Sequence, residues 1–251
     1  MSVVRRFIRA NQALCARLER RLPTAKGHTY RQYPVAVADA IVGHGLRRIV
    51  DVGGGKTCAF SEFTPDHWDG RIVALDIAPE ELRRNHSVHL RLVSDVTRGL
   101  PVRDGGVDMI TSRSVLEHLA DLEGFVAGAA RAVRQGGYFI HWVPNKFAPF
   151  AVVNAILPNR LAKRLLHFLD PHTHGICGFP VVYDRCYPAA MERVFQKHGF
   201  EIVEVRPSYF QSHYYAFFVP FFLVSTLYEG TMQFLGARNL CAHYLIIARR
   251  T

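Results

Sequence analysis

The sequence has few of the features that mark a secreted chain. Only five of its 251 residues are cysteines, and no two of them form a Cys-x-x-Cys pair. The odd, scattered set excludes a disulfide framework and predicts reduced thiols in a cytoplasmic protein. The opening Met-Ser-Val-Val-Arg-Arg has no long apolar core followed by a small-residue cleavage site, so we expect no signal peptide.

Long uncharged apolar runs are also scarce. A membrane-spanning helix needs roughly 20 such residues. The stretch 214–228 carries no charge and is rich in Phe, but it is shorter, contains Pro220 and ends before Glu229. We interpret it as a buried or membrane-facing insertion, with core packing or a homodimer interface as the alternatives.

Acidic residues are the third deficit. Asp and Glu total 21 against 31 Lys and Arg, a formal charge of +10. Such an excess suits nucleic acid, an anionic membrane or an acidic ligand, and it also suits a merely solvated face. Basic and aromatic residues do not alternate as they would in a platform that stacks bases, so a nucleic-acid partner is not favoured. Seven basic residues crowd the N-terminal segment: Arg5, Arg6, Arg9, Arg17, Arg20, Arg21 and Lys26.

Hydrophobic residues make up 49% of the chain, enough for one substantial α/β core. Short β-branched runs alternate with helical periodicity, which predicts a mostly parallel, doubly wound, seven-stranded sheet with helices on both faces. The expected strands are 47–52, 72–76, 90–93, 107–111, 138–143, 201–205 and 243–248. Helices are expected after the first strand, over 122–133 with Gly136-Gly137 closing it, and from Pro188 to Gly199.

The remaining segments are additions to this pattern. We expect an N-terminal helical extension over 1–46, with an amphipathic helix that Pro23 ends and a second helix that begins at Pro34. Tyr30, Arg31 and Tyr33 are expected to form part of a lid. Residues 47–251 form the main domain, with insertions at about 146–187, helical near 161–169, and about 208–238.

The most informative motif follows the first expected strand, as Asp51-Val52-Gly53-Gly54-Gly55-Lys56-Thr57. A phosphate loop would need glycine where Val50 stands, and a dinucleotide fingerprint would need glycine where Cys58 stands. Both remain minor alternatives. The third pattern, Asp-x-Gly-x-Gly, suits a ligand with an ammonium group, because an acid at a strand end attracts the cation.

This third pattern resembles the class I S-adenosylmethionine-dependent methyltransferases, over residues 47–143 and again at the final helix and two strands. The resemblance implies a Rossmann-like fold and S-adenosyl-L-methionine as cofactor, with S-adenosyl-L-homocysteine as product. The segment Ser112-Arg113-Ser114-Val115-Leu116-Glu117-His118 matches the family's segment after the fourth strand. The implied cofactor-binding residues are Asp51, Gly53, Gly54, Gly55, Asp76, Ile77, Asp95, Val96 and Ser112.

Within that set, the roles differ. Asp76 ends the second strand and would hold the ribose hydroxyls, while Asp95 and Val96 would meet the adenine ring. The chain departs from the family at Thr57, where a third glycine is common, and this departure keeps a catalytically silent cofactor-binding or interaction module open.

Two histidines are the candidate catalytic bases. His118 follows the fourth strand, and His174 precedes the final helix, where related enzymes place a histidine facing the acceptor. The alternative is that His118 packs locally and His174 orders the insertion. His172, His174, Cys177 and Cys186 match no established zinc spacing, so no metal is expected.

These residues predict an S-adenosylmethionine-dependent methyltransferase, acting by O-methylation on a small hydrophobic or lipid-linked acceptor. A general base is needed there because a hydroxyl nucleophile is protonated. The basic N-terminal helix and the aromatic stretch favour peripheral membrane contact. An RNA methyltransferase is the alternative.

Overall fold

The computed structural model describes residues 3–156 and 180–251, and these form two compact units. The sheet unit comprises 29–143, 182–206 and 244–251. The helical unit comprises 1–28, 144–181 and 207–243, of which 157–179 lie outside the described residues. The helix expected near 161–169 and His174 fall in that range.

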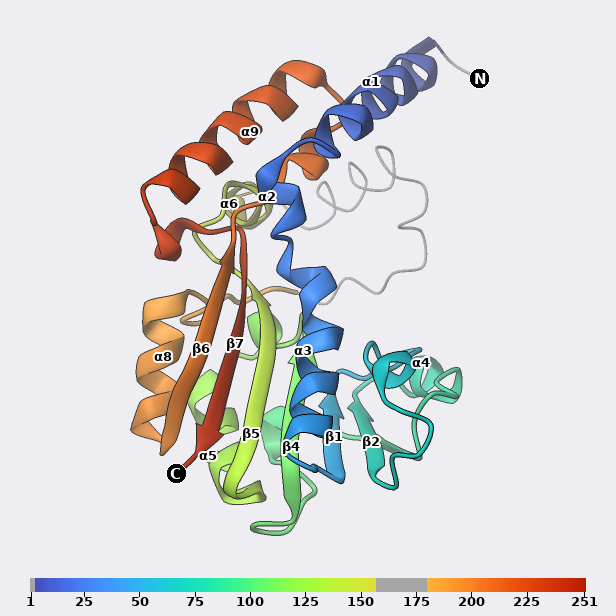
Figure 1. Cartoon of the computed structure of the whole chain (residues 1–251), viewed down its shortest axis with the longest axis vertical. Helices are drawn as coiled ribbons and strands as arrows, with labels where there is room; N and C mark the ends of the chain where they lie inside the picture. The colour runs from blue at the N-terminus through green and yellow to red at the C-terminus, as the bar shows by residue number, and fades with distance from the viewer. Residues whose placement is uncertain (1–2, 157–179) are drawn as a thin grey trace. The chain divides into compact units, whose positions relative to one another are not determined.

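The sheet has seven strands in the order β3-β2-β1-β4-β5-β7-β6 (Figure 1). β1, β2, β3, β4 and β5 pair in parallel. β7 runs opposite to β6, because Thr251 N–H bonds to Gly199 O at one end and Ala242 N–H to Ser208 O at the other. The strands are β1 Arg48–Val52, β2 Arg71–Asp76, β3 Leu90–Val93, β4 Val107–Arg113, β5 Val133–Pro144, β6 Phe200–Ser208 and β7 His243–Arg250. The predicted doubly wound architecture is confirmed.

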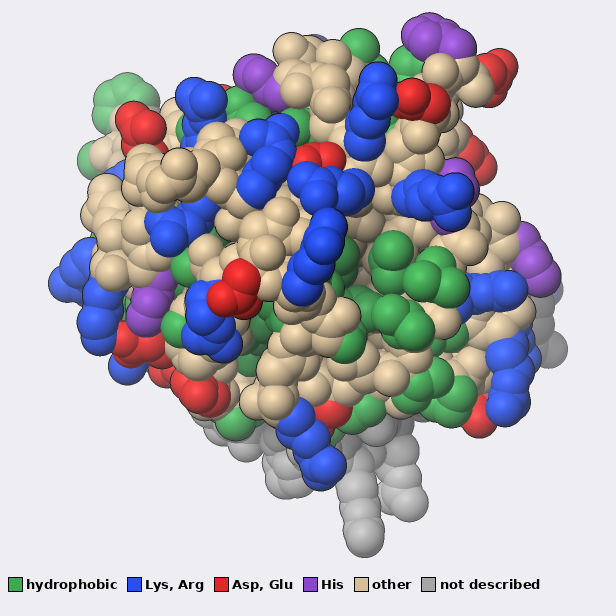
Figure 2. Space-filling model, turned by 90° about the horizontal axis from the view of Figure 1, so that it is seen from below, with side chains coloured by type: hydrophobic (Ala, Val, Ile, Leu, Met, Phe, Trp, Pro, Cys, Tyr) green, Lys and Arg blue, Asp and Glu red, His purple; other side chains and the backbone are tan. Residues whose placement is uncertain are grey.

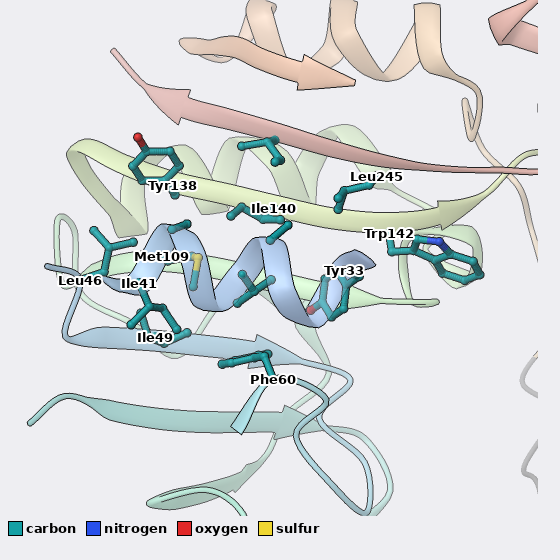
Figure 3. Packing of buried hydrophobic residues seen from close by; sticks show 14 of the residues in the cluster. Tyr33, Ile41, Leu46, Ile49, Phe60, Met109, Tyr138, Ile140, Trp142 and Leu245 are labelled. Atoms are coloured by element: carbon teal, nitrogen blue, oxygen red, sulfur yellow. The ribbon is translucent and has the colours of Figure 1, made fainter. Parts of the chain in front are cut away.

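Helices cover both faces of this sheet. α3 (Thr29–Gly43) lies on one face, where Tyr33, Val37 and Ile41 join Met109 and Ile140 in the core (Figure 3). On the other face, Phe139 packs against Phe125 of α5 (Leu122–Ala132) and against Phe195 of α8 (Pro188–Lys197). The remaining helices of the unit are α4 Pro79–Arg83 and the 3-10 turns Ser61–Phe63, Val96–Arg98 and Leu116–His118.

A carboxylate joins three strands at their amino ends. Asp108 of β4 accepts hydrogen bonds from the Arg47 and Arg48 backbone N–H groups, at 2.9 and 2.8 Å, and from the Arg48 and Arg134 guanidinium groups. Burial alone would raise the pKa of Asp108, but these donors hold it well below its usual range. The link fixes β1, β4 and β5 relative to one another.

Three local predictions were wrong. No α-helix follows the glycine loop, where only the turn Ser61–Phe63 forms, because Pro65 restricts Thr64 to extended backbone. Gly136 does not close the preceding helix but lies inside β5 with φ of +72°. α3 begins at Thr29, so Pro34 lies within it.

The fourth correction concerns Tyr33 alone, one of the three residues expected to form part of a lid. Tyr33 is completely buried, and its hydroxyl hydrogen-bonds Thr111 at 2.7 Å, so it belongs to the core. Tyr30 stays partly exposed and lies under the Arg113 guanidinium, 4.5 Å from Cζ to the ring centre.

The helical unit consists of α1 Val3–Glu19, α2 Pro23–Lys26, α6 Pro149–Ile156, α9 Val219–Phe234 and the 3-10 turns Ser212–Tyr215 and Arg238–Leu240. α1 therefore ends before Pro23, which instead opens α2. Every helix among the described residues is too short or too polar to span a bilayer. The described part of this unit carries two acids, Glu19 and Glu229, against nine basic residues: Arg5, Arg6, Arg9, Arg17, Arg20, Arg21, Lys26, Lys146 and Arg238.

Candidate functional site

The glycine loop leaves β1 at the carboxyl edge of the sheet. Gly53 and Gly55 have φ of +69° and +44°, a left-handed conformation that costs other residues energy. The Gly53 N–H donates to Leu75 O at 2.7 Å. A Cβ on Gly53 would lie 2.2 Å from Cγ2 of Val115, in the loop after β4. The loop is thus held between two neighbouring strand ends, with bare backbone facing any ligand there.

Asp76 holds the glycine loop from the end of β2. Its Oδ2 accepts the Gly55 N–H at 2.9 Å, and its Oδ1 accepts the Ala78 N–H at 2.9 Å. Each carboxylate oxygen retains lone-pair capacity for a further donor. The Ser94 N–H donates to Asp76 O at 2.9 Å, which places the neighbouring Asp95 at the same edge.

Asp51 brings a buried negative group to this edge. It is 6% exposed and makes no salt bridge among the described residues. Burial raises its pKa to about 7, with a smaller contribution from Asp76, while Arg113 and a hydrogen bond with Cys58 oppose the rise. A ligand cation would supply the missing counter-charge and favour the ionised carboxylate.

Of the remaining expected cofactor residues, Ile77, Asp95 and Val96 follow strand ends at this edge, and Ser112 differs in where its side chain points. Ile77 is 53% exposed and Val96 is buried, each directly after an acid of this edge. The Asp95 Oδ1 accepts the Thr97 N–H at 3.0 Å, so it caps the turn that follows β3. Ser112 pairs in register with Val52 next to the loop, and its buried hydroxyl meets His141 Nδ1 at 2.6 Å.

The loop after β4 carries the candidate base. Ser114 has φ of +59°, a strained value for a residue with a side chain. The His118 side chain is 26% exposed, and its Nε2 lies 3.8 Å from Oε1 of Glu117. Since Val115 of this loop packs on the glycine loop, His118 belongs to the same edge. His174, the other expected base, lies outside the described residues.

Glu117 and Arg113 were not singled out from the sequence. Glu117 is 3% exposed with an unpartnered Oε2, and burial raises its pKa to about 8, so it is protonated at neutral pH. Both residues stand in the quoted segment after the fourth strand. The motif therefore contained both residues, but a single sequence does not show whether an acid in it is buried or exposed.

The residues at this sheet edge also distinguish between the three ligands considered for the glycine loop: a nucleotide phosphate, a dinucleotide and S-adenosylmethionine. The Gly55 N–H is already bonded to a carboxylate, two acids adjoin the loop, and no α-helix N-terminus follows it. A phosphate or pyrophosphate would meet negative charge and few free donors. Asp51 and Asp76 suit a ligand that presents an ammonium group and vicinal hydroxyls, as S-adenosylmethionine does.

Comparison with known proteins agrees with this geometry. A methyltransferase domain family matches residues 50–141. Ubiquinone biosynthesis O-methyltransferase of Cupriavidus pinatubonensis is 25% identical over 178 residues, 67% of this chain and 66% of that protein's length. The chain thus matches slightly less than two thirds of this relative.

Solved structures share the fold. An S-adenosylmethionine-dependent methyltransferase from Mesorhizobium loti is 17% identical, covering 82% of this chain and 91% of its own, with a TM-score of 0.53. Magnesium protoporphyrin IX methyltransferase from Synechocystis PCC 6803, with bound S-adenosylhomocysteine, is 12% identical, covering 100% and 89%, with a TM-score of 0.51. Residues 50–141 therefore match a methyltransferase domain, and the chain shares the fold of S-adenosylmethionine-dependent methyltransferases.

Proposed function

We propose that the protein O-methylates a small hydrophobic or lipid-linked acceptor. The part of this proposal that concerns the methyl donor rests on one observation: Asp51, the glycine loop and Asp76 lie together at one sheet edge. The acceptor half is supported by similarity to a ubiquinone biosynthesis O-methyltransferase. It is also supported by the apolar side chains that the helical unit exposes, among them Phe221 and Leu227.

Each donor-binding residue has a distinct role in this proposal. Asp51 pairs with the methionine ammonium, and Asp76, with Ile77 beside it, accepts from the ribose hydroxyls. Asp95 would face the amino group of the adenine, and Val96 would pack against its ring. The bare backbone of Gly53, Gly54 and Gly55 lets the cofactor lie against the loop.

His118 acts as the base. When bound, S-adenosylmethionine would supply an electrophilic methyl group that the acceptor oxygen could take up as the methyl–sulfur bond breaks. His118 takes the hydroxyl proton of the acceptor, a task that suits imidazole near neutral pH. Glu117 lies beside it in the same turn, and burial raises the pKa of that carboxyl to about 8.

The ribose assignment has a direct test. Asp76→Ala removes two acceptor oxygens, so we expect S-adenosylhomocysteine to bind about tenfold to a hundredfold more weakly by isothermal titration. Asp69→Ala deletes the same charge at an exposed position, where the side chain is 65% exposed, and is the matched control. Equal affinity of the Asp76 variant and the parent would refute the assignment.

The acceptor is tested with methyl-labelled cofactor. Phenols with and without a long alkyl tail are offered beside RNA, and we expect label only in the phenols, with the tailed ones preferred. Transfer to RNA alone would support the alternative. Figure 2 shows one face of the molecule, where Lys and Arg side chains lie among neutral, hydrophobic and acidic ones.

A further inference from the structure

Helix α9 buries its charged side chain and exposes apolar ones, the reverse of an ordinary surface helix. Its one charged side chain, Glu229, is 0% exposed and accepts hydrogen bonds from the Gln211 N–H and the Thr24 hydroxyl, each at 2.9 Å, and from the Ser212 N–H. A helix on a protein surface normally buries its apolar face and presents charges to water. α9 satisfies its carboxylate inside and leaves its outer face without any charge.

That outer face is an apolar stripe. Leu223, Val224, Leu227 and Phe234 are 51%, 69%, 72% and 90% exposed. Their spacings of three, four and seven residues place them on one side of the helix. Single exposed apolar residues are ordinary, but a continuous exposed patch marks an interaction surface.

The stripe continues onto α1 within the same unit. The Val219 N–H donates to Asn11 Oδ1 at 3.0 Å, which joins the start of α9 to the middle of α1. The Phe7 ring lies 6.3 Å from that of Phe218, which lies 5.1 Å from that of Phe221. Phe7 and Phe221 are each more than half exposed. We call the exposed residues Phe7, Phe221, Leu223, Val224, Leu227 and Phe234 the α1/α9 surface.

The charged residues around the α1/α9 surface indicate which kind of partner would cover it. Arg5, Arg6 and Arg9 are exposed on the same helix as Phe7. The described part of the unit carries nine basic residues, and Glu229, one of its two acids, is buried. We propose that the α1/α9 surface docks on an anionic lipid bilayer, with the apolar side chains entering the interface and the arginines meeting lipid phosphates. A second copy of the chain would bring the same positive charge and be repelled.

This proposal extends the proposed lipid-linked acceptor, since a docked enzyme would meet acceptors that stay in the membrane. Binding is measured by co-sedimentation with phosphatidylcholine vesicles, with and without phosphatidylglycerol. We expect binding only when phosphatidylglycerol is present and a decline as salt rises. Leu227→Asp should lower the bound fraction about tenfold, because it replaces an exposed leucine that would enter the lipid interface with a charge that anionic lipid repels.

Matched variants make the test specific. Val203→Asp places the same charge on a 54% exposed valine of β6 and should bind vesicles like the parent. Arg5→Gln with Arg6→Gln should weaken binding several-fold, whereas Arg83→Gln with Arg84→Gln, exposed on or beside α4, should not.

Three results would overturn the proposal: no association of the parent with anionic vesicles, equal loss in the Val203 and Leu227 variants, or a dimer in sedimentation equilibrium that Leu227→Asp dissociates. Affinity for S-adenosylhomocysteine without vesicles should be the same in all variants. Docking without transfer to any tailed phenol would refute the proposed acceptor and leave the docking surface standing.

Discussion

At the scale of single residues, we expect Asp51 to make cofactor binding depend on pH. Its pKa is raised to about 7, so the carboxylate is ionised above that pH and protonated below it. Because only the ionised form attracts an ammonium, we expect affinity for S-adenosylhomocysteine to be full above about pH 7 and to fall by up to about tenfold per pH unit below it. Titration calorimetry across this range measures the change.

The matched variant is Asp51→Asn, which removes the charge and keeps the shape. It should bind weakly at every pH and lose the dependence between about pH 6 and 8. If this variant retained the pH dependence of the parent, the titrating group would lie elsewhere.

Gly53 is the second residue whose chemistry the structure fixes. Alanine there would clash with Val115 at 2.2 Å and strain a backbone with φ of +69°. We expect Gly53→Ala to abolish measurable cofactor binding and to destabilise the protein by about 1–3 kcal/mol. Gly55→Ala is the comparison, because its Cβ would meet only ordinary contacts, 3.8 Å or more away. Similar binding by the two variants would show that the close approach of Val115 is unimportant.

At the scale of elements, Glu229 holds α9 to the rest of the helical unit. Glu229→Ala would leave the Gln211 and Ser212 N–H groups without their carboxylate acceptor in a buried place. We expect a loss of about 2–4 kcal/mol of unfolding free energy in that unit, measured by far-ultraviolet circular dichroism in denaturant. Glu229→Gln keeps one acceptor oxygen and should lose less. An unchanged midpoint for both variants would show that the carboxylate is not structural.

Elements with a strong periodic pattern were predictable, and elements set by tertiary contacts were not. The strand Val107–Arg113 follows from a short apolar run, buried on both faces, and the helix Leu122–Ala132 follows from helical periodicity. The reversed polarity of α9 was invisible, because the sequence shows an uncharged aromatic run and cannot say which side of it faces water. The hydrogen-bond donors that surround Glu229, among them the Gln211 N–H and the Thr24 hydroxyl, determine which side of α9 faces inward.

At the scale of the whole molecule, topology explains why the meeting of the candidate donor-binding residues could be predicted. Parallel strands deliver their carboxyl ends to one edge, so acids far apart in sequence, such as Asp51 and Asp76, meet there. Ser112 was predicted from the same reasoning, but the alternation of side chains along β4 turns its hydroxyl toward His141. The catalytic base and the acceptor depend on contacts that no strand pattern encodes.

The division into two units predicts two separable responses to ligand and mutation. Both tryptophans of the chain, Trp68 and Trp142, lie in the sheet unit, so tryptophan fluorescence reports that unit alone. S-adenosylhomocysteine at about a hundred times its dissociation constant adds about 2.7 kcal/mol to the state that binds it. We therefore expect the fluorescence-monitored Tm to rise by about 5–10 °C with this ligand.

Glu229→Ala should affect the other unit. We expect it to lower the unfolding midpoint measured by circular dichroism and to leave the midpoint measured by tryptophan fluorescence nearly unchanged. The reason is that the hydrogen bonds of Glu229 stay within the helical unit, at Thr24, Gln211, Ser212 and Ser225. Equal shifts of both midpoints would mean that the two units unfold as one cooperative body.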